Sequence, residues 1–356
     1  MDFIQTILER KRPSSKEISV VLFEQCNNAC SFCYQTNDER HNASVEMILD
    51  KIDTTKSAID KIKKPIKLKL LGGELFFDTL PDKIIEAYKY YIEEIIKYCE
   101  KQNKKLEIGF ATNLLYTKLD RLIDLIDYVK SFGIVCNIST SFDFWGRFHN
   151  KQHYLLWKEN LYKMQKHLTV ISMVLSKPNI MKFMKKEESV LDDIDLREEF
   201  DDLYKDNFKF FFEYYNPDSN SFDVATPSDR DVLEFFKYLV DNYPEVQPIP
   251  DFLDEKPNKE LYCESLVCIN CHGEVCGCRS TSIKGTNLFD EGYEQDKDNT
   301  IIENAFVNKY KCLTCPKFSI CPLGCFMFFS LKENKSTCIF KELFDYIERK
   351  GNAGIR

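Results

Sequence analysis

The stretch ISVVLFEQCNNACSFC, residues 18–33, determines how the rest of the sequence is interpreted. It begins with an apolar run of strand length and continues directly into three closely spaced cysteines. A loop that leaves the carboxyl end of a strand emerges at the sheet edge where parallel α/β folds place their chemistry. The stretch therefore predicts the first strand of a parallel sheet, with a reactive site directly after it.

Runs of strand character and runs of helical character alternate six times between about residue 20 and residue 215. IKLKLL (66–71) and KLEIGFAT (105–112) are two of the strand-like runs, and each precedes a segment with apolar residues at helical spacing. Repeated strand–helix units favour an α/β fold whose parallel sheet, open or barrel-like, carries helices on its outer face. The expected helices include 45–62, 84–99, 119–129, 154–166 and an acidic, solvated one within 187–206.

Local signals predict several helix ends. Ser44 is placed to cap the first helix, and Thr226 with Pro227 is expected to begin a helix that runs to Tyr243. Residues 241–259 contain four prolines and no apolar period, so we expect a linker there.

Composition changes along the chain predict three parts. They are a barrel over residues 1–220, a helix and linker over 221–262, and a cysteine-rich domain over 263–356 that ends with a helix at 339–349. An apolar fraction of 44% and a charged fraction of 30% over 356 residues are typical of a globular, water-soluble chain.

Charge and hydropathy exclude several classes of protein. No apolar run approaches the roughly 20 residues that a membrane helix needs. The first residues mix acids and bases, so no secretory signal is evident and we expect a cytoplasmic protein. The net charge of −8, without a stripe of bases and aromatics, disfavours nucleic acid as a partner.

Cysteine usage indicates metal binding. The chain has 15 cysteines, which is too many for chance core residues. A disulfide framework is not expected either, because the cytoplasm is reducing. Cys26, Cys30 and Cys33 lie within eight residues, and three thiolates leave one iron of a [4Fe-4S] cluster open. The alternative is a zinc site completed by a distant histidine. Isolated Cys99 and Cys136 are expected to be core residues, because Cys99 continues an apolar helical stripe and Cys136 lies on the side of its strand that faces the helices.

The segment CNNACSFC, with Phe32 just before the last cysteine, resembles the Cx3Cx2C motif of radical S-adenosylmethionine enzymes. The resemblance implies a partial (β/α)6 barrel in which Cys26, Cys30 and Cys33 hold a [4Fe-4S] cluster. It also implies that S-adenosylmethionine chelates the fourth iron and is cleaved to a 5′-deoxyadenosyl radical.

The same resemblance implies contacts to S-adenosylmethionine at the ends of successive strands. A GGE segment after the second strand would hold the methionine amino group, although it could equally be a simple turn. A serine ending the fourth strand is a candidate ribose contact or an ordinary loop-edge residue. The full set of implied contacts is Phe32, Tyr34, Gly72, Gly73, Glu74, Asn113 and Ser141.

Period-2 alternation in the fourth strand predicts which of its residues face the lumen of the barrel. It places Asn137, Ser139 and Ser141 on the lumen face, and Ile138 with Cys136 on the face toward the helices.

The last part of the chain resembles the SPASM domain, an iron–sulfur extension of many radical enzymes that modify peptides. A hairpin is expected to turn at His272-Gly273. By the resemblance, Cys312, Cys315, Cys321 and Cys338 would ligate one auxiliary [4Fe-4S] cluster, and Cys263, Cys278 and Cys325 would belong to another. The fourth ligand of the latter could be Cys276, which strand alternation favours, or Cys268, Cys271 or an open position.

The favoured function is a radical enzyme that modifies a ribosomally made peptide or a protein, with flavodoxin or ferredoxin as electron donor. The alternatives are radical chemistry on a small molecule and a non-catalytic iron–sulfur or zinc module. Sulfatase maturation is disfavoured, because such enzymes carry an aspartate directly after the hairpin cysteine where this chain has Arg279. The sequence does not identify a catalytic acid or base.

Overall fold

The computed structural model describes residues 15–33, 42–215, 225–254, 266–276, 307–323 and 338–352. The strands are β1 (Lys16–Val21), β2 (Ile66–Leu71), β3 (Leu106–Ala111), β4 (Val135–Ser141), β5 (Leu168–Leu175), β6 (Val190–Leu191), β7 (Ile194–Asp195), β8 (Phe210–Tyr214), β9 (Leu266–Ile269) and β10 (Val275–Cys276). The helices are α2 (Val45–Leu49), α3 (Lys51–Asp60), α4 (Asp82–Lys101), α5 (Asp120–Ser131), α6 (Lys151–Lys163), α7 (Lys177–Phe183), α8 (Leu196–Lys205), α10 (Asp229–Asn242), α11 (Ile249–Leu253) and α14 (Ile339–Asn352), with a 3₁₀ turn η4 (Cys312–Thr314). None of these helices has the length and apolar character needed to cross a membrane.

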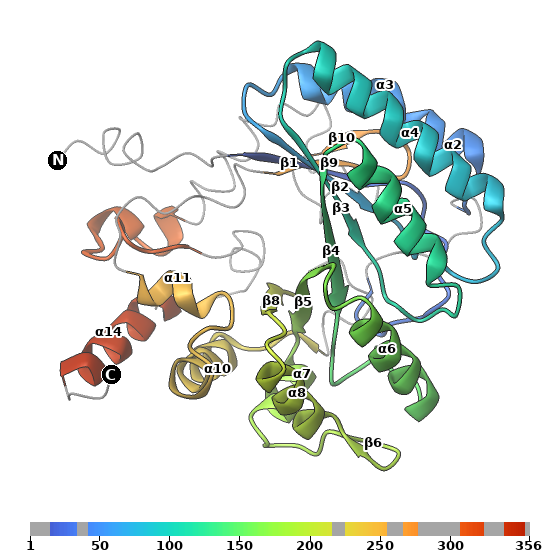
Figure 1. Cartoon of the computed structure of the whole chain (residues 1–356). Coiled ribbons are helices and arrows are strands. Elements are labelled where there is room, and N and C mark those ends of the chain that lie inside the picture. Colours follow the sequence, from blue (N-terminus) through green and yellow to red (C-terminus); the bar gives the residue numbers. More distant parts are fainter. Residues whose placement is uncertain are drawn as a thin grey trace.

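Eight strands form one curved sheet in the order β10-β9-β1-β2-β3-β4-β5-β8 (Figure 1). Every neighbouring pair in this sheet is parallel except β9 with β10. The strands β1 to β5 and β8, with their crossover helices, make the partial (β/α)6 barrel that the sequence predicted. The fold class is therefore confirmed.

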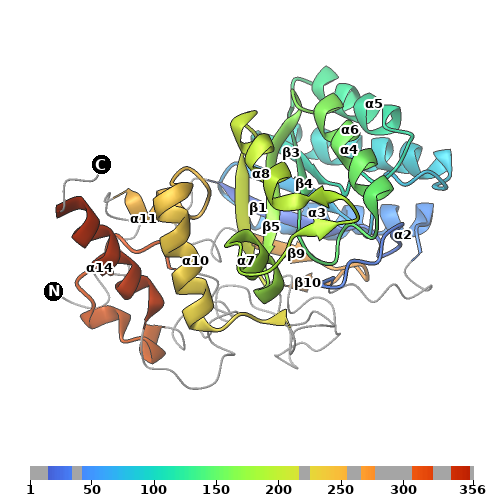
Figure 2. The same ribbon diagram turned by 90° about the horizontal axis from the view of Figure 1, so that it is seen from below.

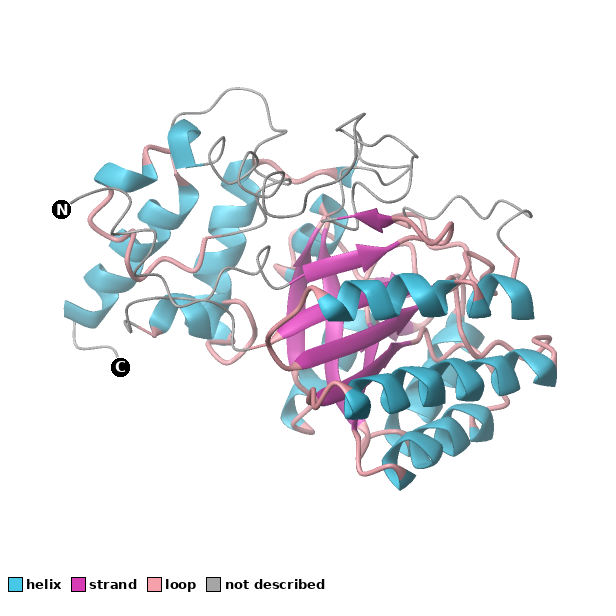
Figure 3. Cartoon of the chain, turned by 90° about the horizontal axis from the view of Figure 1, so that it is seen from above, coloured by secondary structure: helices cyan, strands magenta, loops and turns pink. Residues whose placement is uncertain are grey.

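The helices cover one face of the sheet (Figures 2 and 3), and the side chains on that face are apolar. In β4, Ile138 is fully buried, while Asn137, Ser139 and Ser141 on the opposite face are only half-buried. Cys136 lies on the face of Ile138 and packs against the core, as expected. The concave face of β4 is therefore polar.

Helix α4 shows why the helices cover the sheet. Its apolar side chains recur every three or four residues and so form one stripe along the helix. The stripe is buried and consists of Ile84, Ile85, Tyr88, Ile92, Ile95, Ile96 and Cys99. The expectation that Cys99 is a core residue is thereby confirmed.

The predicted cap of the first helix is confirmed, but the predicted start of α10 is wrong. Ser44 accepts a hydrogen bond from Met47 N at 3.1 Å. At α10 the capping residue is Ser228, not Thr226, because Ser228 and Asp231 bond each other's backbone N–H groups reciprocally. This capping box satisfies two donors that a cap at Thr226 would leave open.

The expected linker over 241–259 is wrong for its described part. Gln247 N donates to Phe210 O at 3.2 Å, and Phe212 N donates to Gln247 O at 2.9 Å, so the chain pairs with β8. Helix α11 follows, because Pro248 and Pro250 stand at the helix start, where a missing N–H costs nothing. Phe252 of α11 stacks on Phe340 of α14 at 5.4 Å.

The acidic segment expected as one helix within 187–206 is a short ribbon followed by a helix. Strands β6 and β7 pair antiparallel, with Asp192 in the left-handed conformation (φ 55°) between them. Asp195 then caps α8 by accepting a hydrogen bond from Arg197 N at 2.9 Å. Sequence periodicity missed the ribbon because two-residue strands leave no period to detect.

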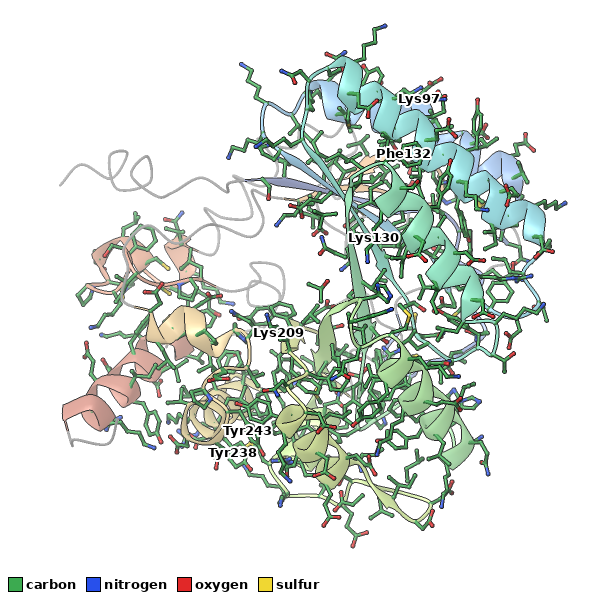
Figure 4. The ribbon with its side chains drawn as sticks, in the orientation of Figure 1. Lys97, Lys130, Phe132, Lys209, Tyr238 and Tyr243 are labelled. Atoms are coloured by element: carbon green, nitrogen blue, oxygen red, sulfur yellow. The ribbon has the colours of Figure 1, made fainter. Side chains whose placement is uncertain are left out.

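A buried arginine joins α8 to α7 and α10. The guanidinium of Arg197 lies 4.5 Å from the Phe183 ring centroid, and its Nε donates to Phe183 O at 2.9 Å. It also donates hydrogen bonds to the hydroxyl groups of Tyr238 and Tyr243 (Figure 4). Its Nη1 forms a salt bridge with Asp201, and because these groups together satisfy the buried charge, Arg197 has a structural role.

The predicted hairpin is confirmed, and it joins the barrel. Strands β9 and β10 are antiparallel, with Gly273 in the turn at φ 81°. Strand β9 pairs parallel with β1, from Glu17 opposite Leu266 to Val20 opposite Ile269. The segment after residue 262 thus contributes to the sheet, whereas the domain boundaries at residues 220 and 262 remain predictions.

Replacing Ser228 by alanine tests the capping box. We expect Ser228→Ala to lower the free energy of unfolding by about 1 kcal/mol, because the first turn of α10 loses its side-chain acceptor. The measurement is denaturant unfolding followed by circular dichroism. Ser57→Ala, on the exposed side of α3, is the control and should cause no loss. Equal stability of the two variants would contradict the assigned cap.

Candidate functional site

The three-cysteine loop starts at the carboxyl end of β1 and runs beside the segment that follows β2. Gly73 N donates to Phe23 O at 3.0 Å, and Glu74 N donates to Gln25 O at 2.9 Å. A Cβ at Gly73 would lie 2.1 Å from Gln25 O, so only glycine fits this approach. The structure thus assigns Gly73 to the contact between two loops, while its predicted contact to a ligand remains a prediction.

Cys26, Cys30 and Cys33 form no disulfide, and all three are half-buried. Asn28 lies between the first two: its backbone N is 3.4 Å from Cys26 Sγ, and its Nδ2 is 3.3 Å from Cys30 Sγ. Cys33 N donates to Cys30 O at 3.0 Å, which turns the chain back toward the other two cysteines. The loop therefore groups the three predicted ligands around Asn28.

No three Cys, His, Asp or Glu side chains within the described ranges meet closely enough to hold a single metal ion. A four-iron cluster is larger than an ion, so the thiols that hold it need not converge on one point.

Burial keeps the thiols of Cys26 and Cys30 protonated when no metal is bound. Burial, together with the nearby Glu74 charge, raises the pKa of Cys26 to about 12. Burial also raises the pKa of Cys30. The Arg147 charge lowers this pKa and the Asp143 charge raises it, and the effect of Arg147 is the larger of the two. Because thiolates are the ligands of iron, metal binding at this loop has to release protons.

Glu74 connects the ends of three strands. Its side chain is 1% exposed and accepts hydrogen bonds from Thr112 Oγ1 at 2.9 Å and from Asn113 N at 2.5 Å. Asn113 in turn donates through Nδ2 to Asn27 Oδ1 at 2.8 Å, in the cysteine loop. Predicted residues Glu74 and Asn113 are thus brought together beside Cys26. Burial raises the pKa of Glu74 to about 7.

The end of β4 adds Ser141 and a loop that the sequence analysis did not single out. Ser141 Oγ lies 3.3 Å from Ser172 Oγ on the concave face. After it, buried Asp143 accepts a hydrogen bond from Arg147 Nε at 2.8 Å. Ser31 N donates to Gly146 O at 3.0 Å, so this loop is joined to the cysteine loop.

Arg147 is buried beside two of the predicted cluster ligands. Burial opposes its charged form, but the neighbouring Cys30 and Asp143 raise its pKa above the usual range. Its guanidinium lies 5.2 Å from the centroid of the Phe32 ring. The sequence contains a signal that could have identified Arg147. It stands four residues after Asp143, in a loop that follows a strand.

Two histidines follow this loop. His149 is exposed and His153 is half-buried, and their rings are 5.5 Å apart at the start of α6.

The later cysteines are only partly within the described residues. Cys263, Cys278 and Cys325 lie outside the described residues, and so does Tyr34, the predicted S-adenosylmethionine contact. Cys312 and Cys321 are buried, Cys315 and Cys338 are half-buried, and Cys315 interacts electrostatically with Cys338. Four of the predicted ligands therefore lie within η4 and the segments around it.

The hairpin cysteines occupy different positions. Cys276 stands opposite Cys268 in the β9–β10 register, and Cys268 is fully buried. Cys271 packs against Val21 and Leu71 at the strand ends, with its Sγ 3.7 Å from a Glu24 oxygen. Cys271 thus lies near the cysteine loop of the barrel, and the fourth ligand of that cluster remains a prediction.

Comparisons with known proteins identify the fold. No family model matches the sequence, and no curated protein matches it. The solved structure "Native anSMEcpe with bound AdoMet" has a TM-score of 0.62 at 15% identity and covers 95% of this chain and 98% of its own. The structure "Native anSMEcpe with bound AdoMet and Cp18Cys peptide" has a TM-score of 0.59 at 15% identity. It covers 96% of this chain and 99% of its own.

Protein anSMEcpe is a radical S-adenosylmethionine protein of the SPASM type. At this identity the likeness establishes the fold alone. The resemblance inferred from the cysteine motifs is therefore confirmed at the level of the fold.

Replacing Gly73 by alanine tests the contact between the two loops. We expect Gly73→Ala to lower the free energy of unfolding by about 1–3 kcal/mol, because the new methyl group overlaps the backbone at Gln25. Gly351→Ala is the matched control, since a Cβ there meets nothing within 4 Å. Denaturant unfolding of both variants, without metal, gives the comparison. Wild-type stability in Gly73→Ala would contradict the close approach.

Proposed function

We propose that this chain is a radical S-adenosylmethionine enzyme that modifies a peptide or protein. The observation that carries the proposal is the loop after β1. It groups three cysteines that form no disulfide at the carboxyl edge of a half-barrel, next to the ends of β2 and β3. The likeness to anSMEcpe, which was solved with bound AdoMet, supports the same conclusion.

The residues of the loop fit an iron–sulfur cluster. Cys26, Cys30 and Cys33 supply three soft sulfur ligands, and two N–H groups of Asn28 point to two of the sulfurs. Hydrogen bonds of this kind are typical of metal-bound cysteines. With S-adenosylmethionine, a [4Fe-4S] cluster in this loop would supply a 5′-deoxyadenosyl radical that takes a hydrogen atom from the substrate.

The strand ends around the loop supply suitable groups for S-adenosylmethionine. A carboxylate suits the methionine ammonium, and Glu74 is a buried carboxyl group whose pKa is about 7 in the absence of a ligand. An ammonium beside it would favour the ionised form and so gain binding energy. Our proposed contacts are Phe32, Tyr34, Gly72, Gly73, Glu74, Asn113 and Ser141.

The concave face suits a peptide. It presents half-buried polar side chains at several positions across the sheet, and these can pair with backbone amides and carbonyls. They are Lys69, Asn137, Ser139, Ser141, Ser172 and Glu213. The anSMEcpe structure with the Cp18Cys peptide supports a peptide as the substrate class. Sulfatase maturation is disfavoured because Arg279 stands where such enzymes carry an aspartate. Arg279 lies outside the described residues.

The later cysteines are proposed as ligands of auxiliary clusters, reduced by flavodoxin or ferredoxin. Cys312, Cys315, Cys321 and Cys338 would hold one, and Cys263, Cys276, Cys278 and Cys325 the other. The electrostatic interaction of Cys315 with Cys338 supports the first group.

The test is the release of 5′-deoxyadenosine by anaerobically reconstituted protein given dithionite and S-adenosylmethionine. We expect the Cys26→Ala/Cys30→Ala/Cys33→Ala variant to lose release and about four irons, as one cubane requires. Cys99→Ala/Cys136→Ala is the matched control and should keep both, because these cysteines belong to the core.

Unchanged release from the triple variant would overturn the proposed site. If the wild type binds iron at this loop but never releases 5′-deoxyadenosine, with or without peptides encoded beside its gene, a non-catalytic module becomes the better reading. Release that only a small molecule stimulates would instead favour the small-molecule alternative.

A further inference from the structure

Asn28 lies at the centre of the cysteine loop in a fixed orientation. Its side chain is 9% exposed, and its Nδ2 donates to Arg147 O at 3.1 Å and to Cys30 Sγ at 3.3 Å. A backbone carbonyl can only accept, so the amide nitrogen has to face Arg147 O. The same orientation directs the amide at Cys30, although Oδ1 is left without a hydrogen-bond partner within the described residues.

An unpartnered buried oxygen has a cost that an ordinary structural asparagine would avoid. An apolar side chain of similar size would avoid that cost, but it would take the Nδ2 donor away from Arg147 O and from Cys30 Sγ. The backbone N of Asn28 also points to a sulfur, that of Cys26 at 3.4 Å. Asn28 is therefore arranged to donate hydrogen bonds to two thiolates.

A second contribution comes from the loop after β4. Arg147 is 7% exposed, and Asp143 holds it by a 2.8 Å bond to Nε. Asp143 is itself held by Val174 N at 2.8 Å and Asn179 Nδ2 at 2.9 Å, so the guanidinium cannot move away freely. It interacts electrostatically with Cys30 and Cys33. At Cys30 its effect exceeds the opposing effect of Asp143.

The two loops are also packed closely where they meet. Gly146 has a φ of 76°, and a Cβ there would lie 2.8 Å from Ser31 Cβ. Ser31 stands directly after Cys30 in the chain. The position of the guanidinium relative to the thiols is therefore set by backbone contacts as well as by Asp143.

We propose that Asn28 and Arg147 are positioning residues that raise the reduction potential of the cluster held by Cys26, Cys30 and Cys33. This inference rests on the proposed function. Reduction transfers one electron from an external donor to the cluster and adds one negative charge, with no bond broken. A buried cation and N–H donors at the sulfurs stabilise the more negative state, so they make reduction easier.

The experiment is a redox titration of full-length, reconstituted protein followed by electron paramagnetic resonance, without S-adenosylmethionine. The relevant signal is the one that the Cys26→Ala/Cys30→Ala/Cys33→Ala variant lacks, which separates it from any auxiliary cluster. We expect Arg147→Met and Asn28→Leu each to shift its midpoint to a lower potential. Arg147→Lys, which keeps the charge, should shift it less than Arg147→Met.

Arg121→Met is the matched control, because Arg121 pairs with Asp82 on the outer helices and should leave the midpoint unchanged. Should Arg147→Met fail to fold because Asp143 is left unpaired, Asp143→Asn/Arg147→Met removes both charges. Asn28→Leu tests the inference without changing any charge.

Unchanged midpoints in Arg147→Met and Asn28→Leu, with wild-type iron content, would overturn this inference alone. A wild type without any signal that depends on Cys26, Cys30 and Cys33 would overturn the proposed function, and this inference with it.

Discussion

The close approach of two backbone segments, residues 23–25 after β1 and residues 72–74 after β2, is the constraint on which the candidate site depends. Parallel pairing of β1 with β2 brings the two segments out of the sheet side by side. Their hydrogen bonds continue that pairing beyond the strands, and the absence of a side chain at Gly73 permits it. The cysteines that follow are therefore positioned by the sheet itself.

A buried carboxyl group extends the same constraint to β3. Glu74 receives hydrogen bonds from Thr112 and Asn113, and Asn113 reaches the cysteine loop through Asn27. Such a group is costly to bury in its ionised form, and its pKa of about 7 reflects that cost. A cation bound beside Glu74 would offset part of the cost of burying its ionised form.

The later part of the chain is joined to the barrel at its edges. Strand β9 covers the open side of β1, which would otherwise expose unpaired backbone groups. At the other end of the sheet, Gln247 pairs with β8, and α11 then packs on α14 through Phe252 and Phe340. Cysteines of the hairpin consequently lie near the barrel, as Cys271 beside Glu24 illustrates.

The sequence by itself determined the strand–helix order, the polar concave face of β4, the cap at Ser44, the hairpin at Gly273 and the location of the three-cysteine loop. These features depend on patterns within a few residues, which periodicity and spacing record. Tertiary structure alone decided the pairing of β9 with β1, the packing of α11 on α14, and the contacts of Glu74 with Asn113 and of Asn28 with Arg147. Each of these joins residues far apart in the chain, and no local pattern encodes which distant groups will meet. The start of α10 was determined partly by each. The sequence offered both Thr226 and Ser228 as capping residues, and the reciprocal hydrogen bonds with Asp231 selected Ser228.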